Sequence, residues 1–102
     1  MRIVTEKRIM EYASRHPNAR SSLQNFVEKI KYSHFNNFEE LRRVFPSADQ
    51  VIVGSGRRTI VFNIQGNRHR LVAACHYNTG LVFILKIMTH AEYNKNKWKE
   101  VL

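Results

Sequence analysis

A continuous apolar stretch that runs directly into a helix-start signal places the strongest constraint on the fold. Residues 81–88 (LVFILKIM) are apolar except for Lys86, which is typical of a strand buried on both faces inside a sheet. The next four residues match the T-x-x-E capping box, in which Thr89 caps a helix and Glu92 reaches back to the cap. The sequence therefore predicts a strand that ends where a helix begins, with His90 at the first helical position.

His90 is a candidate functional residue because of this position. The N-terminus of a helix offers free N–H groups and a positive dipole end, which favour an anion. A titratable imidazole beside an anion is suited to proton transfer. The alternative is an ordinary surface histidine in the first turn of a helix, and the spacing alone leaves both open.

The length and charge of the chain limit its class. Its 102 residues, 43% of them hydrophobic, suffice for one compact domain spanning residues 1–102 and are too few for two. The net charge is +9, and residues 57–102 carry eight Lys or Arg against two acids. Such a bias indicates a polyanionic partner, nucleic acid first and an anionic membrane second. A charge that serves only solubility is the alternative, although small domains rarely need so much of it.

Cysteine usage and hydropathy point to the cytoplasm. A lone cysteine, Cys75, excludes an internal disulfide, and its place in an apolar strand predicts a small core residue. Neither a signal-peptide core nor an apolar run long enough for a bilayer is present, so we expect no membrane association. The spacing of His69, His76 and His90 matches no common metal site, and we expect no metal and no other cofactor.

The first 46 residues are predicted to form a scaffold without chemistry. The expected elements are an edge strand at 1–4, helices at about 6–15 and 19–32, and a short helix from Asn37 to Phe45-Pro46. Thr5 is expected to cap the first helix. In that helix, the residues expected to face inward are Ile9, Met10 and Ala13. The second helix carries a clear apolar stripe of Leu23, Phe26, Val27 and Ile30.

From residue 50 onward the hydrophobic period changes to two, which predicts strands. The expected strands are at about 50–53, 58–64, 68–76 and 81–88. Gly66-Asn67 indicates a two-residue hairpin, and residues 78–80 indicate a three-residue hairpin in which Gly80 supplies a positive φ. The chain is therefore expected to be α+β, with N-terminal helices on one face of a twisted, mainly antiparallel sheet and a short C-terminal helix.

The two turns fix a register, and the register gathers polar side chains on one face. The expected cross-strand pairs are Asn63–Arg70, Val61–Val72, Val72–Lys86 and Arg70–Met88. The core face is expected to hold Ile60, Phe62, Ile64, Leu71, Ala73, Cys75, Phe83, Leu85 and Ile87. The other face is expected to hold Asn63, Arg68, Arg70 and Lys86, with His90 just past the strand end. A slip of one residue in either turn would scatter this patch.

The predicted patch suits a metal-free ribonuclease. Arg70 offers a fork for phosphate, Lys86 a point charge and His90 a proton shuttle, while Tyr93 lies one helical turn further on. The 2′-hydroxyl of RNA would attack its own phosphate, which DNA cannot do. The predicted catalytic residues are His90, Arg70, Lys86 and Tyr93. The predicted RNA contacts are Arg57, Arg58, Asn63, Arg68, Lys95 and Lys97.

Each residue also has an ordinary structural explanation. Arg70 and Lys86 can be cations of a sheet surface, Tyr93 can be a packing residue, and Trp98 can anchor the last helix. For the whole chain, the alternative function is a non-catalytic, basic RNA- or DNA-binding module, which the charge alone would explain. A membrane-binding C-terminal helix is a weaker idea, because its apolar face is small.

Two motifs resemble the HigB toxins of bacterial toxin–antitoxin systems, a group within the RelE-like superfamily. They are F-N-I-x-G-N-x-x-R-L-V at 62–72 and M-T-H-x-E-Y at 88–93. The resemblance implies a small α/β fold with two N-terminal helices on an antiparallel sheet. It also implies an endoribonuclease that cuts mRNA on the translating ribosome, and a cognate helix-turn-helix antitoxin of the HigA type.

The resemblance also assigns roles to four positions. His90 matches the place where some RelE-like toxins have a catalytic histidine and others an arginine. Arg70 matches a phosphate-contacting strand arginine, and Tyr93 a C-terminal aromatic residue of the site. Lys86 departs from the arginine expected there, so the charge is kept while the bidentate fork is lost. Which group is the acid and which the base stays open.

Overall fold

The chain folds into one five-stranded sheet with helices on both sides. The computed structural model describes residues 1–102. The strands are β1 (Arg2–Val4), β2 (Asp49–Ile52), β3 (Arg58–Ile64), β4 (His69–His76) and β5 (Leu81–Thr89), in the sheet order β1-β5-β4-β3-β2. Only the β1–β5 pair is parallel. The predicted α+β class is confirmed, and each strand boundary lies within one residue of its expected place.

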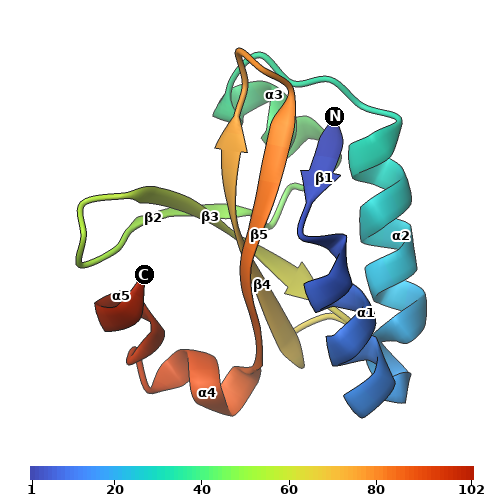
Figure 1. Ribbon diagram of the computed structural model, residues 1–102, viewed down its shortest axis with the longest axis vertical. Coiled ribbons are helices and arrows are strands. Elements are labelled where there is room, and N and C mark those ends of the chain that lie inside the picture. Colours follow the sequence, from blue (N-terminus) through green and yellow to red (C-terminus); the bar gives the residue numbers. More distant parts are fainter.

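The helices divide between the two faces of the sheet. They are α1 (Glu6–Arg15), the 3-10 turn η1 (Pro17–Ala19), α2 (Arg20–Lys31), α3 (Phe38–Val44), α4 (His90–Asn94) and α5 (Trp98–Val101). Figure 1 shows α1 and α2 on one side of the sheet and α4 and α5 on the other. The C-terminal segment forms two short helices instead of one, because Asn96 adopts a left-handed conformation (φ 61°) between them. No helix has the length and apolar character needed to cross a bilayer.

The main core lies between the sheet and helices α1, α2 and α3. The predicted stripe of α2 is confirmed, since Leu23, Phe26 and Ile30 are buried there. The ring of Phe26 packs edge-on against Phe62 of β3, with 4.9 Å between centroids. At the start of α3, the Asn37 side chain accepts a hydrogen bond from the Glu40 N–H, as expected for a cap.

Two expectations for α1 are wrong. Met10 is 69% exposed, and Tyr12 takes the inward place that Met10 was expected to fill. Thr5 precedes the helix but makes no side-chain cap, because its backbone is left-handed (φ 66°). Its hydroxyl donates instead to the Ile84 carbonyl oxygen, 3.2 Å away. The tight reversal from β1 into α1 therefore sets the conformation of Thr5.

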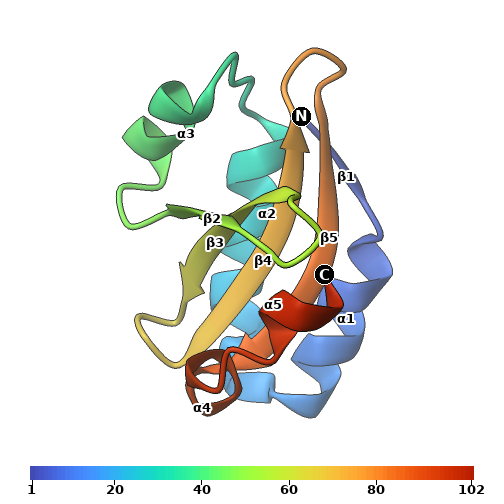
Figure 2. The ribbon, with the colours of Figure 1, turned by 90° about the vertical axis from the view of Figure 1, so that its left-hand side faces the viewer.

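A second, smaller core on the opposite face was not foreseen in the sequence. It consists of Val53, Val61, Val72, Met88 and Trp98. Helix α5 covers it by docking on the β2–β3 loop, where the Gly54 N–H donates to the Lys99 carbonyl oxygen at 2.8 Å. Figure 2 shows α5 and this loop on the near side of the sheet. A Cβ atom at position 54 would lie 3.0 Å from that oxygen, so a larger residue would force the loop and α5 slightly apart.

All four predicted cross-strand pairs are present in the sheet. The β4–β5 loop is nevertheless one residue longer than expected. His76 pairs with Leu81, which leaves a four-residue loop in place of the expected three-residue turn. Gly80 has the expected positive φ of 69°.

A bulge in β5 reconciles the longer loop with the expected pairs. Val72 pairs with Lys86, whereas the next residue, Ala73, pairs with Ile84, so Leu85 is an extra residue in β5. In the part of β5 before the bulge, the side chains that face the main core are those that were expected to face the other way. The prediction that Phe83 and Leu85 face the main core is therefore wrong, and Val82 and Ile84 are buried there instead. After the bulge the side chains of β5 again face the expected sides of the sheet, so Lys86 lies opposite Val72.

Helix α1 satisfies the backbone of the bulge. The Arg8 guanidinium donates to the Leu85 carbonyl oxygen, beside the bond from Thr5 to Ile84. These carbonyl groups lie beyond the end of β1 and have no strand partner on that side. Contacts far apart in the chain thus stabilise the irregularity that sets the register of the candidate site.

Candidate active site

Arg70 is a nearly buried arginine held by the backbone around it. It lies on β4, is 8% exposed, and its Nη1 atom donates to the carbonyl oxygens of Asn67 (2.9 Å) and His69 (3.1 Å). Its guanidinium also lies over the ring of Tyr93, 5.2 Å from the centroid. The β3–β4 turn and α4 therefore fix the direction in which the guanidinium points.

His90 sits beside this guanidinium. Its Nδ1 atom is 3.4 Å from Nη2 of Arg70, and its backbone N–H donates to the Arg68 carbonyl oxygen at 2.9 Å. A guanidinium only donates, so this contact requires an unprotonated Nδ1. The other ring nitrogen, Nε2, lies 3.0 Å from the Nδ2 atom of Asn94, so both nitrogens of the ring face N–H donors.

The start of α4 is confirmed at His90, but it is not the open anion site that the sequence suggested. The Glu92 carboxylate accepts from the Thr89 N–H (3.0 Å) and hydroxyl (3.1 Å), and the Glu92 N–H donates to the Thr89 hydroxyl. The backbone hydrogen bond from Thr89 is the main reason why the pKa of Glu92 is lowered. The chain's own carboxylate therefore occupies the position expected for an external anion.

Tyr93 connects Arg70 to the second core. Its ring stacks on Trp98 with 5.4 Å between centroids and presents its other side to the Arg70 guanidinium. Trp98 is 3% exposed, and its indole N–H donates to the Tyr93 carbonyl oxygen at 3.1 Å. Trp98 is thus the anchor that the sequence allowed, and it holds Tyr93 against Arg70.

Lys86 lies between two cationic depressions of the surface. One, of about 320 Å³, also contains Lys95 and Lys97. The other, of about 370 Å³, also contains Arg8 and Arg15 of α1. The Lys86 ammonium has no hydrogen-bond or ion-pair partner, so it is free to meet a phosphate. Three of the expected RNA and catalytic residues are therefore gathered along one edge of the site.

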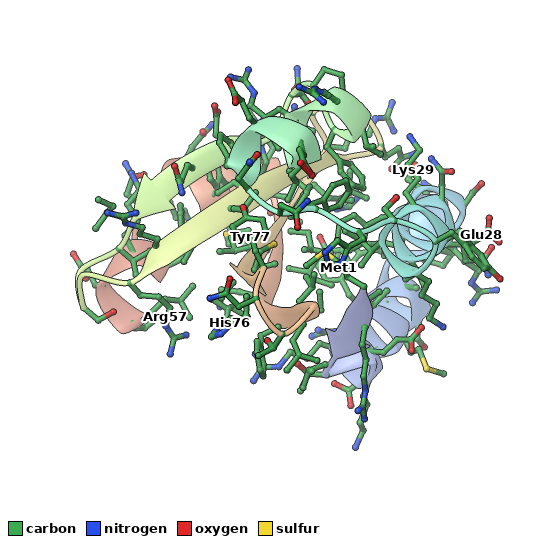
Figure 3. The ribbon with its side chains drawn as sticks, turned by 90° about the horizontal axis from the view of Figure 1, so that it is seen from above. Met1, Glu28, Lys29, Arg57, His76 and Tyr77 are labelled. Carbon is green, nitrogen blue, oxygen red and sulfur yellow. The ribbon has the colours of Figure 1, made fainter.

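The remaining predicted RNA contacts divide into two groups. Asn63 and Arg68 are exposed and adjoin the site, since Asn63 pairs with Arg70 across the sheet. Arg57 and Arg58 are exposed at the other end of β3, where they line a groove with His76 and Phe83. Figure 3 shows Arg57 and His76 close together and away from α1 and α2. The structure therefore does not bring Arg57 and Arg58 to the pair of Arg70 and His90.

A buried polar cluster beside the site was only partly foreseen. His69 faces the main core as expected, but its Nδ1 atom lies 2.6 Å from the Tyr12 hydroxyl. Burial, and then the charges of His16 and Arg68, lower the pKa of His69, whereas burial raises the pKa of Tyr12 to about 12. Both groups are therefore neutral near pH 7. The spacing of Tyr12 and His16, four residues apart on one helix, is the signal that could have revealed the cluster.

Other reactive groups have structural roles. Burial raises the pKa of the Cys75 thiol to about 12, and its side chain packs against the main core. A buried thiol with a raised pKa is a poor nucleophile. No group of three or more His, Cys, Asp or Glu side chains is arranged to hold a metal ion.

The fold and the site define a class: small, basic α+β proteins with a RelE-like sheet and a strand arginine beside a C-terminal imidazole. A family model described as "HigB_toxin, RelE-like toxic component of a toxin-antitoxin system" matches residues 19–96. The chain belongs to this family.

Similar proteins bear related names. The chain is 31% identical over 94 residues to the mRNA interferase toxin HigB of Escherichia coli K12. The aligned residues make up 92% of this chain and 88% of the relative. It is equally similar to the mRNA interferase HigB of Shigella flexneri. It is 30% identical over 95 residues to an mRNA interferase HigB of Escherichia coli O6:H1, with 93% and 90% covered.

Proposed function

We propose that this toxin is an endoribonuclease that cleaves mRNA on the translating ribosome and so stops growth. The pairing of a nearly buried arginine with the imidazole of His90, at the edge of a surface rich in lysine, is the observation that supports this most directly. The names of the relatives, which are mRNA interferases, agree with it. A substrate on the ribosome also implies that the toxin acts in the cytoplasm.

The proposed reaction is a transesterification at phosphorus. The 2′-oxygen of one nucleotide attacks the adjacent phosphate, the bond from phosphorus to O2′ forms, and the bond from phosphorus to O5′ breaks. His90 accepts the proton of the 2′-hydroxyl, because its Nδ1 becomes a free acceptor when the phosphate takes its place as the partner of Arg70 Nη2, while Nη1 keeps its bonds to the backbone. The departing O5′ takes a proton from the Tyr93 hydroxyl or the Lys86 ammonium.

Charge on the phosphate is stabilised by groups that are already in place. Arg70 is held by the carbonyl oxygens of Asn67 and His69, so little reorganisation is needed when the transition state forms. Lys86, Lys95 and Lys97 supply further positive charge without bonds of their own to break. The reaction needs no metal ion, and the required 2′-hydroxyl restricts it to RNA.

The proposed partner is a helix-turn-helix antitoxin of the HigA type, as expected for the toxin of such a system. By binding over the lysine-rich edge, or by holding α4 away from β4, an antitoxin would separate the phosphate from His90. The antitoxin therefore restrains the nuclease until it is removed.

A cell-free translation reaction tests the proposal. The purified toxin is added to ribosomes translating a defined mRNA, and new 5′ ends are mapped by primer extension. Cuts are expected with the parent protein and at least a hundredfold fewer with His90→Ala, on the scale of a lost general base. Arg43→Ala, an exposed arginine on α3, is the control and should cut normally.

The same experiment recognises the alternative function. A non-catalytic RNA-binding module would bind RNA with a steep salt dependence and leave it intact with or without ribosomes. Uncut mRNA with the parent protein, or full cleavage by His90→Ala, would contradict the proposed mechanism.

A further inference from the structure

A second polar pocket lies directly beside the candidate active site, and the proposed reaction does not use it. It has a volume of about 330 Å³ and is enclosed by the end of α1, the η1 turn, the β3–β4 turn and the start of β4. The residues that matter for the argument are Arg15, His16, Gln65, Arg68 and His69. No hydrophobic side chain lines it.

Two of these side chains each have a polar atom without a protein partner. The Oε1 atom of Gln65 is buried without a hydrogen bond. His69 is 8% exposed, and its Nε2 atom has no protein partner but is not fully buried, so it is accessible from the pocket. Tyr12 has no acceptor for its hydroxyl hydrogen except Nδ1 of His69, so Nε2 carries the hydrogen of the neutral ring. Buried polar groups of native proteins are nearly always paired, and such exceptions point to a missing ligand or water.

The unpaired groups match the edge of a nucleobase. Gln65 offers an acceptor once its amide rotates to turn the unpaired oxygen toward the pocket, and His69 offers a donor. Every base presents donors and acceptors side by side on its edges. His16 adds a flat ring at the same pocket, and imidazoles serve as stacking surfaces for unpaired bases. Arg15 and Arg68 add two cations for the phosphate of the same nucleotide.

The pocket is joined to the active site through Arg68. Its carbonyl oxygen accepts the His90 N–H at 2.9 Å, while its side chain lines the pocket. His69, in turn, is the neighbour of Arg70 in β4 and its carbonyl oxygen accepts from that guanidinium. A nucleotide in this pocket would therefore adjoin the one whose phosphate meets Arg70 and His90.

We propose that this pocket is a nucleotide-recognition subsite, in which Gln65 and His69 read the base of the RNA residue next to the scissile phosphate and Arg15 and Arg68 hold its phosphate. The inference rests on the proposed ribonuclease function and deepens it. It explains how a surface dominated by positive charge selects where to cut. The left-handed backbone of Gln65 (φ 52°) belongs to the tight β3–β4 turn, where it is followed by the positive φ of Gly66.

Direct binding tests the subsite without any cleavage. The intact, isotope-labelled protein is titrated with the four nucleoside 3′-monophosphates, with ribose 5-phosphate and with inorganic phosphate, while the side-chain signals of Gln65 and His69 are followed by NMR. One or two of the nucleotides should move these signals with a clear affinity. The two phosphates that carry no base should move them weakly and bind at least tenfold less tightly.

Matched variants locate the contact. Gln65→Met keeps the size of the side chain. It should weaken the affinity for the preferred nucleotide about threefold to tenfold, which corresponds to the loss of one neutral hydrogen bond. Gln24→Met, at an exposed position of α2, should leave binding unchanged. In the mapped cleavage assay, Gln65→Met should still cut mRNA but lose the preference for one base beside the cut.

The outcomes separate this inference from the function on which it rests. If every probe leaves Gln65 and His69 unmoved, or inorganic phosphate binds as well as any nucleotide, the subsite is wrong. It is also wrong if Gln65→Met cuts at the same sites with the same preference. If the parent protein binds a nucleotide here but cuts no RNA, the subsite stands and the proposed nuclease function fails.

Discussion

The Nη2 atom of Arg70 on β4 lies 3.4 Å from the Nδ1 atom of His90 at the start of α4. The guanidinium only donates, so Nδ1 is the acceptor in this contact. Two residues twenty positions apart in the chain thus place a positive charge and a proton acceptor side by side.

Arg70→Lys tests whether the fork matters as well as the charge. A lysine keeps the positive charge but cannot reach both carbonyl oxygens and the imidazole, so cleavage should fall by about 10²-fold to 10³-fold. Single-turnover cleavage on programmed ribosomes measures the effect, and thermal unfolding confirms that the variant is folded. Arg43→Lys serves as the control, and an equal rate for Arg70→Lys would remove the guanidinium from the mechanism.

Lys86→Met and Tyr93→Phe identify the donor to the leaving oxygen. If the Tyr93 hydroxyl supplies the proton, Tyr93→Phe should lower the cleavage rate about 10²-fold while keeping the ring contacts with Arg70 and Trp98. If the Lys86 ammonium supplies the proton, Lys86→Met should lower the cleavage rate to a similar extent. The fall in rate at alkaline pH should then be absent from the pH–rate profile of this variant. Two unaffected rates would show that the proton comes from neither group.

Tyr12→Phe tests the buried hydrogen bond to His69. The substitution leaves Nδ1 of a nearly buried ring without a partner, so the free energy of unfolding should fall by about 1–3 kcal/mol. Chemical denaturation measures it. Tyr32→Phe is the matched control, because Tyr32 is 89% exposed and its loss of a hydroxyl should change nothing.

The lowered pKa of His69 predicts a dependence of stability on pH. In the unfolded chain His69 titrates near 6.5, whereas burial and the charges of His16 and Arg68 keep it neutral to lower pH in the folded protein. Between these two values the unfolded state binds more protons, so stability is lost as the pH falls below about 6.5. His69→Gln should flatten this part of the curve, and an unchanged slope would contradict the buried, neutral ring.

Glu92→Ala tests the capping box that positions His90. Removing the carboxylate frees the Thr89 N–H, so stability at pH 7 should fall by about 1 kcal/mol and α4 should lose its order. The pKa of Glu92 is lowered, so its contribution is present above its unfolded value of 4.5 and is lost as the pH falls through the folded value. Glu28→Ala, on the exposed side of α2, is the control.

Much of the fold was predictable because local signals and global packing agree. The α2 stripe, the cap at Asn37 and the Gly66-Asn67 turn each specify their element without help from distant residues. The register of Asn63 and Arg70 followed from that turn alone. The family resemblance added the function, which charge and spacing by themselves left open between a nuclease and a binding module.

The errors occurred where contacts distant in sequence decide the outcome. Nothing near Leu85 announces a bulge, since Arg8 and Thr5 of another segment satisfy its backbone. Met10 and Tyr12 are both apolar enough to face inward, but Tyr12 shares the helix face of Ile9 and Ala13 and meets His16 and His69 there. The sequence predicts the capping box, but it does not show that the Glu92 carboxylate takes up the Thr89 N–H and hydroxyl that were expected to meet an anion.

The extra residue in β5 divides that strand into two halves that tolerate change differently. Toward the β4–β5 loop, a gained or lost residue can be compensated at Leu85, so this end of the hairpin is free to vary in length over evolution. Beyond Leu85, from Lys86 to His90, an inserted or deleted residue would rotate a lysine away from its neighbours and carry the imidazole out of reach of Arg70. Functional relatives should therefore differ in the number of residues before this point and keep a constant spacing after it.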